Sequence, residues 1–362
     1  MAGRCIQPLY EMMQQAVSRG VFCAGVLQVD SHGRTVHLSA HGRTSLWPGA
    51  GSVRPDTCFD LASLTKPLAT TTVVLQLLRR GALGLEQRVG RWLPRAACAQ
   101  ATIAQLLEHS SGLPAWRPFF YEVASWPAAW THGGPAAVRR LAARQRPERP
   151  PGQRALYSDV GFILLEWIIE RASGQRLDRL FRRLVNRHLP GAGLFFPLTP
   201  GQRRRHRFAA TELCPWRGRV LCGQVHDDNA YVMGGVSGHA GLFGTSGAVA
   251  ALAGAWLDAF RGRRSWLPTE MVRRFWQRAP QPGSSRTLGW DKPSGENSQA
   301  GRLLGAATVG HTGFTGTSLW LDPERQLVIV LLTNRVHPDR GNQAISRFRP
   351  RLHDLIAKVV DR

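Results

Sequence analysis

Residues 61–74 read LASLTKPLATTTVV and contain one of only three lysines in a chain whose other 44 basic Lys and Arg residues are arginines. Ser63 precedes Lys66 by three residues, and the apolar spacing around the pair predicts a helix over 65–80. On such a helix the two side chains lie on the same face, near the positive end of the helix dipole. The stretch therefore places a hydroxyl beside an amine.

A lysine at this position indicates base chemistry. A buried amine near other cations can lose its proton, whereas a guanidinium keeps its charge, so arginine would not replace Lys66 in that role. The alternative is an exposed serine at a helix start followed by a solvated lysine. A three-residue spacing is too short a motif to choose between these interpretations.

A second segment, PGQRALYSDVGFILLEWIIERASG at 151–174, leads into a strongly apolar helix that ends at Gly174. Tyr157 and Asp159 stand at the start of that helix. The structural explanation is an N-cap at Ser158 or Asp159 and a core tyrosine whose hydroxyl is satisfied. The functional explanation is a titratable pair held by a helix terminus.

A third segment, GHTGFTGTSLWLD at 310–322, has the pattern of a strand interrupted by glycines. Its first residues are His311, Thr312 and Gly313. A bulge at a strand edge would account for the glycines. A strand edge that approaches a ligand would account for them equally well.

Taken in order, SLTK, YSD and HTG resemble the SxxK, YxN and KTG or HTG motifs of the serine β-lactamase and penicillin-binding-protein superfamily. The intervals are similar to those of its class C β-lactamase, DD-peptidase and esterase branch. LLEHSSGLP at 106–114 resembles a loop of this branch. VHDDNAYVMGGVSGHAGLFGTSGAVAAL at 225–252 resembles a segment of hydrolases close to penicillin-binding protein 4B. The resemblance extends over about residues 10–358.

This resemblance implies a serine hydrolase that forms an acyl-enzyme. Ser63 would be the nucleophile, and Lys66 and Tyr157 would share its proton, with Tyr157 passing it to the leaving group. A free tyrosine has a pKa of about 10, so a tyrosine base at neutral pH needs cations close by. The backbone N–H groups of Ser63 and Phe314 would form the oxyanion hole.

The resemblance also implies that His311, Thr312 and Gly313 form the substrate-binding strand, with Thr312 as a hydrogen-bond donor. Two positions depart from the commoner pattern. Asp159 replaces an asparagine, which removes an amide donor and adds an anion beside Lys66. His311 replaces a lysine and makes the positive charge pH-dependent. Both changes disfavour an efficient β-lactamase and suit an esterase, an amidase or a DD-carboxypeptidase.

The expected fold class is α/β (α+β), similar to β-lactamases and transpeptidases, as a single unit over residues 1–362. Strand patterns at both ends predict one mostly antiparallel sheet, flanked by terminal helices. The sheet subdomain would span about 1–60 and 285–362, and a mainly helical lobe about 63–284. Strands are expected in a hairpin over 21–42 and at 305–313, 317–324 and 326–334, and helices at 101–108, 135–145, 160–173, 176–187 and 246–260.

The net charge of +23 raises the question of a nucleic-acid partner. The arginines are spread over the whole chain without a zinc finger, an RNP-like motif or a basic heptad, so no nucleic acid is expected. The rival interpretation is a non-catalytic binding protein on the same fold with an anionic partner. The expected partner is instead a small-molecule or peptide-like substrate; the sequence does not indicate the oligomeric state.

Neither a metal nor an organic cofactor is implied. The six cysteines lack zinc-finger spacing. The polar run at 226–229 is interpreted as the loop at a helix start, and His239 as a residue that borders the site. The first 20 residues lack the pattern of a signal peptide, and no stretch has the about 20 apolar residues that span a bilayer. A cytoplasmic location is therefore expected.

Overall fold

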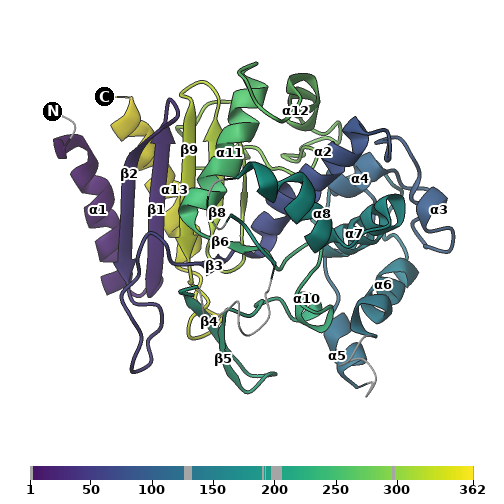
Figure 1. Cartoon of the computed structure of the whole chain (residues 1–362), viewed down its shortest axis with the longest axis horizontal. Coiled ribbons are helices and arrows are strands. Elements are labelled where there is room, and N and C mark those ends of the chain that lie inside the picture. Colours follow the sequence, from purple (N-terminus) through teal and green to yellow (C-terminus); the bar gives the residue numbers. More distant parts are fainter. Residues whose placement is uncertain are drawn as a thin grey trace.

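The computed structural model describes residues 3–125, 133–189, 191, 193–196, 206–295 and 298–361. One half of the molecule is a five-stranded antiparallel sheet with the strand order β2-β1-β9-β8-β7 (Figure 1). Its strands come from the two ends of the chain, as the sequence patterns predict. They are β1 (Ala24–Ser31), β2 (Arg34–Gly42), β7 (Val309–Thr312), β8 (Ser318–Asp322) and β9 (Leu327–Thr333).

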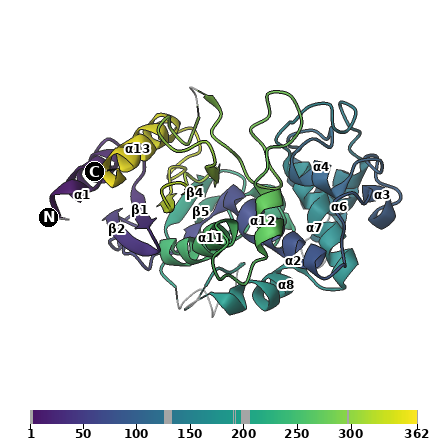
Figure 2. The same ribbon diagram turned by 90° about the horizontal axis from the view of Figure 1, so that it is seen from above.

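Helices cover both faces of this sheet. On β9, Val328 and Val330 belong to the core under α11 (Ser246–Phe260), whereas Leu327 and Ile329 belong to the core under two terminal helices. This alternation follows from the two-residue period of a strand. The terminal helices are α1 (Gly3–Ser18) and α13 (Ile345–Val360), which lie side by side (Figure 2). The predicted arrangement of a sheet flanked by terminal helices is confirmed.

The other half is helical, and α7 (Asp159–Ser173) lies in its middle. The Ser158 hydroxyl caps this helix by accepting from the Gly161 N–H, and Gly174 ends it at a φ of 67°. Its neighbours and the remaining helices are α2 (Thr72–Arg79), α3 (Val89–Trp92), α4 (Ile103–Leu107), α5 (Phe119–Ala124), α6 (Gly134–Arg144), α8 (Leu177–Leu184), α10 (Asp228–Val232) and α12 (Thr269–Phe275). Two small sheets pair β3 (Phe59–Asp60) with β6 (Phe243–Gly244) and β4 (Ala210–Cys214) with β5 (Arg219–Cys222).

The segment predicted as a helix over 65–80 is helical, but it begins with a π-helix and only its second part is regular α-helix. A 3-10 helix (Ala62–Leu64) is followed by a π-helix (Lys66–Thr71) and then by α2. Wide π turns inside helices occur mainly at functional sites, because they reorient side chains that regular α geometry would place elsewhere.

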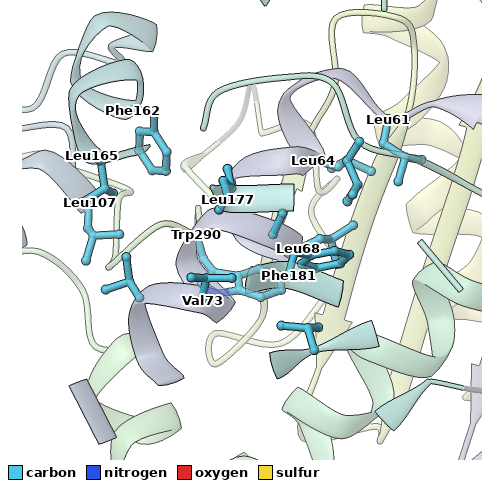
Figure 3. Packing of buried hydrophobic residues seen from close by; sticks show 14 of the residues in the cluster. Leu61, Leu64, Leu68, Val73, Leu107, Phe162, Leu165, Leu177, Phe181 and Trp290 are labelled. Carbon is cyan, nitrogen blue, oxygen red and sulfur yellow. The ribbon is translucent and has the colours of Figure 1, made fainter. Parts of the chain in front are cut away.

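The core fixes this irregular segment in place. Leu61, Leu64 and Leu68 are fully buried, and Figure 3 shows them in the same cluster as Phe162 and Trp290. Because the apolar side chains point inward, the polar side chains between them are held at fixed positions. In the described part of the chain, no helix combines the length and apolar character that crossing a membrane requires.

Candidate active site

The turn before Ser63 has an unusual backbone. Ala62 has a φ of 47°, a left-handed conformation that is rare outside glycine. The buried carboxylate of Asp60 accepts hydrogen bonds from the N–H of Ala62 at 2.8 Å and from that of His226 at 2.6 Å. Asp60 therefore holds the strained turn and joins it to the polar loop at 226–229.

Lys66 lies beneath Ser63 and is completely buried. Its Nζ is 3.1 Å from the Ser63 Oγ, 3.1 Å from the carbonyl oxygen of His239 and 2.7 Å from the Asp159 carboxylate. Burial alone would lower the pKa of Lys66, but the Asp159 carboxylate outweighs burial and raises it. Because an ammonium has three N–H donors, the three oxygens match the charged form of Lys66.

Tyr157 stands beside this lysine, with its ring centroid 4.8 Å from the Nζ of Lys66. His109 packs against the tyrosine at 4.6 Å between ring centroids, and its Nδ1 accepts from the N–H of Ser158. The Tyr157 hydroxyl is buried without a well-aligned hydrogen bond among the described residues, although Lys66 and Ser63 lie close enough to lower its pKa. Burial raises the pKa of Tyr157, and the Lys66 ammonium acts in the opposite direction. A hydroxyl that lacks a well-aligned bond and lies beside a nucleophile is free to exchange a proton with a substrate.

The strand β7 approaches the nucleophile turn closely because residue 313 is a glycine. A Cβ at Gly313 would come within 2.1 Å of the Thr317 Oγ1 and 2.8 Å of the Leu61 carbonyl oxygen. The hydroxyls of Thr317 and Thr315 also donate to the carbonyls of Leu61 and Asp60. These contacts hold the β7 edge against the segment that carries the nucleophile.

His311 is buried and uncharged. Its Nδ1 lies 2.8 Å from the Thr312 carbonyl oxygen, which can only accept, so Nδ1 carries the proton and Nε2 has the lone pair. Burial lowers the pKa of His311 far below its ordinary value, and Lys66 and Arg286 add to this effect. The sequence-based expectation of a pH-dependent positive charge here was wrong for the physiological range, because burial and neighbouring cations keep the imidazole neutral.

The backbone after His311 presents a free donor. The Phe314 N–H has no hydrogen-bond partner among the described residues. The ring of Phe314 is half exposed, packs on His226 at 5.6 Å between centroids, and lies under the Arg335 guanidinium at 4.3 Å. Ser63 and Phe314 line the same cavity, and the oxyanion hole expected from their N–H groups stays a prediction.

These groups surround a cavity of about 730 Å³, a volume typical of small-molecule sites. Every residue predicted for the site lines it except Lys66, which lies buried beneath Ser63. The predicted residues on its wall are Ser63, Tyr157, Asp159, His311, Thr312, Gly313 and Phe314. The structure thus brings together residues from positions 63 to 314 of the chain.

The same cavity contains arginines that the sequence analysis missed. Arg349 on α13 is buried, donates to the carbonyls of Gly313 and Thr317, and leaves its Nε without a partner among the described residues. Neither Arg349 nor Arg335 forms an ion pair with any described residue, whereas Arg340 pairs with Glu212. Burial lowers the pKa of Arg349 to about 9. With 44 arginines in the chain, no sequence signal marks these two.

The polar run at 226–229 is a helix start, as predicted. Asp227 caps α10 by accepting from the Ala230 N–H at 2.7 Å. His226 bonds to Glu212 and Asp228 pairs with Arg217, so these side chains point to different partners. In the ranges that the structure describes, no three His, Cys, Asp or Glu side chains are grouped to hold a metal ion.

Comparisons with known proteins agree with the fold. A family model described as Beta-lactamase matches residues 13–350. A protein of Escherichia coli K12 with the provisional name D-alanyl-D-alanine carboxypeptidase is 34% identical over 307 residues, covering 78% of this chain and 70% of that protein. An N-acetylmuramyl-L-alanine amidase of Bacillus subtilis strain 168 is 28% identical over 361 residues, covering 90% and 80%.

Solved structures share the fold at low identity. EstCE1, described as a hydrolase with promiscuous acyltransferase activity, superposes with a TM-score of 0.77 and 20% identity, covering 98% of this chain and 99% of that chain. An octameric penicillin-binding protein homologue from Pyrococcus abyssi has a TM-score of 0.75 and 18% identity, covering 98% of this chain and 77% of that chain. The β-lactamase/transpeptidase-like fold expected from the sequence is confirmed.

Proposed function

Because the chain belongs to the β-lactamase family and is a serine hydrolase that acts through an acyl-enzyme, we propose that its substrates are D-amino-acid peptides, or related amides and esters, whose leaving group ends in a free carboxylate. The observation that carries this proposal is the buried Arg349 guanidinium, which has no acidic partner among the described residues. An unpaired buried cation is costly, and a carboxylate in the cavity would offset that cost.

The proposed reaction begins with the attack of Ser63 on the substrate carbonyl. The three oxygens around Lys66 favour its ammonium form, so Lys66 is a poor proton acceptor in the resting site. In the fraction of molecules in which Tyr157 is ionised, the Ser63 proton therefore passes to the phenolate while the new C–O bond forms. The ammonium of Lys66 stabilises that phenolate.

The tetrahedral intermediate then collapses. Its oxyanion accepts from the N–H groups of Ser63 and Phe314, and Tyr157 returns the proton to the departing amine or alcohol as the bond to it breaks. Water attacks the acyl-Ser63 ester in the second half, with Tyr157 taking the proton from the water. Tyr157 then returns this proton to the Ser63 Oγ as the acyl–Ser63 bond breaks, which releases the acid and restores the enzyme. Thr312, on the edge strand, donates to the substrate.

The neutral His311 supports a peptidase or esterase over an efficient β-lactamase. Its Nε2 is a buried acceptor without a partner among the described residues, and it lies on the same wall as Tyr157, at 5.7 Å between ring centroids. A neutral imidazole here offers no positive charge to a substrate carboxylate. That charge comes from Arg349.

The test is the intact mass of the protein after incubation with a fluorophosphonate and, separately, with a penicillin. The wild type is compared with Ser63→Ala and with Ser125→Ala, which removes an exposed serine away from the site. An adduct that Ser63→Ala abolishes and Ser125→Ala retains supports the proposed nucleophile. Folded wild-type protein that gains no mass with either reagent overturns it.

A further inference from the structure

Asp227 presents one constrained and one free carboxylate oxygen. Its Oδ1 accepts from the Nε2 of His239 at 2.8 Å and from the N–H of Ala230 at 2.7 Å. Its Oδ2 has no hydrogen-bond partner among the described residues, and the side chain is 24% exposed on the wall of the active-site cavity. The two bonds fix the carboxylate, so Oδ2 is the oxygen left to meet a ligand.

This carboxylate is ionised. Burial would raise its pKa, but the hydrogen bonds from His239 and Ala230 outweigh burial and hold the pKa of Asp227 well below its usual range. No arginine or lysine among the described residues pairs with it. The neighbouring Asp228 differs, because it is neutralised by Arg217. Asp227 therefore contributes a carboxylate to the cavity wall, with Oδ1 held by His239 and Oδ2 left for a ligand.

The position of Asp227 relative to the reacting atoms follows from Lys66. The carbonyl of His239 and the carboxylate of Asp159 meet the Lys66 ammonium at different corners of its tetrahedron. His239 thus contacts Lys66 through its carbonyl oxygen and Asp227 through its side chain. Asp227 and Tyr157 both line the cavity.

We propose that Asp227 is a specificity-determining residue that binds an ammonium group of the substrate. The inference rests on the proposed function, in which Ser63 forms the acyl-enzyme in the cavity that Asp227 lines. His239 is its positioning residue, with its Nδ1 held by the Ser237 hydroxyl at 2.8 Å. With Arg349 on the leaving-group side, the cavity selects substrates that carry both charges.

The experiment compares two fluorophosphonates with alkyl chains of equal length, one ending in an ammonium and the other in a methyl group, over a series of chain lengths. Second-order rate constants for the modification of Ser63 are measured by intact mass. The variants are Asp227→Asn, which keeps the cap on α10 and removes the charge, and Asp258→Asn, which removes an exposed charge outside the cavity.

The wild type and Asp258→Asn should prefer the ammonium probe at one best chain length by roughly tenfold, the strength of a charge-assisted hydrogen bond. In Asp227→Asn, the rate constant for the ammonium probe divided by that for the methyl probe should fall to about one. A general loss of Ser63 reactivity lowers both rate constants and leaves this ratio unchanged. Equal rates for both probes in the wild type, or an unchanged preference in Asp227→Asn, overturn the inference while leaving the proposed function intact. Failure of both probes to modify Ser63 overturns both.

Discussion

The carboxylate of Asp159 lies 2.7 Å from the ammonium of Lys66, directly beneath the nucleophile Ser63. The pair makes the site differ from the commoner SxxK and YxN arrangement, because an anion now stabilises the charge on the lysine. The same anion opposes ionisation of Tyr157. The aspartate thus stabilises the ammonium of Lys66 and destabilises the phenolate of Tyr157. The proposed mechanism needs the ammonium and the phenolate together.

Asp159→Asn should move the pH–rate profile toward acid. Without the carboxylate, the pKa of Tyr157 falls, so the phenolate forms at lower pH, and the pKa of Lys66 falls as well. Removing a charge at this distance shifts a neighbouring pKa by roughly 1 unit or more. Measurement of kcat/KM from pH 5 to 10 would check this, with Asp178→Asn as the control. A profile that stays in place or moves toward alkali contradicts the proposed roles.

Lys66→Arg should abolish turnover although it retains a positive charge. The three oxygens around Nζ fit a compact ammonium in a fully buried space, and a guanidinium is larger and planar. We expect kcat/KM to fall by roughly 10³-fold, the loss typical of a removed catalytic group. Hydrolysis assays show this loss, while circular dichroism reports the fold. Activity within a few-fold of the wild type would exclude a specific role for the amine.

Gly313→Ala should damage both activity and stability. The added Cβ would lie 2.1 Å from the Thr317 Oγ1 and 2.8 Å from a backbone oxygen that belongs to the nucleophile segment. The matched control is Gly254→Ala in α11, where a Cβ meets nothing within 4 Å; it should stabilise the helix by about 0.5 to 1 kcal/mol. Thermal unfolding and acylation rates measure both effects. A fully active and stable Gly313→Ala would show that the close approach does not matter.

Arg349→Gln should raise KM for substrates with a free terminal carboxylate more than for their methyl esters. The guanidinium is buried and its Nε has no partner among the described residues. Losing a charge-assisted hydrogen bond costs roughly tenfold in affinity. Steady-state kinetics on a D-alanyl-D-alanine peptide and its ester give the ratio. Equal losses for both substrates would indicate that Arg349 only supports the Gly313 turn.

The sequence predicts the sheet and its flanking helices from local periodicity, and it predicts the eight candidate site residues from the resemblance of three ordered motifs to those of a known family. The structure places these eight residues in or beneath one cavity. It misses Asp60 and Arg349 for different physical reasons. Asp60 acts through the backbone N–H of Ala62, and a backbone contact leaves no residue pattern. Arg349 is one of 44 arginines in the sequence, and its burial in the folded protein is what distinguishes it. The π-helix at 66–71 was also missed, since tertiary packing, rather than helix propensity, selects it.

The stability of the sheet half should fall with acid through His353. This residue is fully buried between the Gln299 carbonyl and the Ser318 hydroxyl, and burial lowers its pKa to about 3. The unfolded chain takes up the proton below about pH 6.5 and the folded chain does not, so stability is complete above that pH and declines below it. Between pH 7 and 5 the loss is about 2 kcal/mol.

Urea unfolding at pH 7 and pH 5 measures this decline. His353→Gln should be less stable at pH 7 because it loses the buried contacts, but its stability should change less between the two pH values. His32→Asn, at an exposed turn between β1 and β2, should show the same decline as the wild type. An equal decline in His353→Gln would assign the acid sensitivity to other groups.

The strand order places β9, from near the end of the chain, between β1 and β8, and the β7 edge closes on a nucleophile turn more than 240 residues earlier. During synthesis on a ribosome, Ser63 and Lys66 emerge long before Gly313 and Phe314. Under the proposed mechanism, a chain still being translated carries Ser63 without the Phe314 N–H that would stabilise the oxyanion. Hydrolase activity would therefore arise only when the last strands join the sheet.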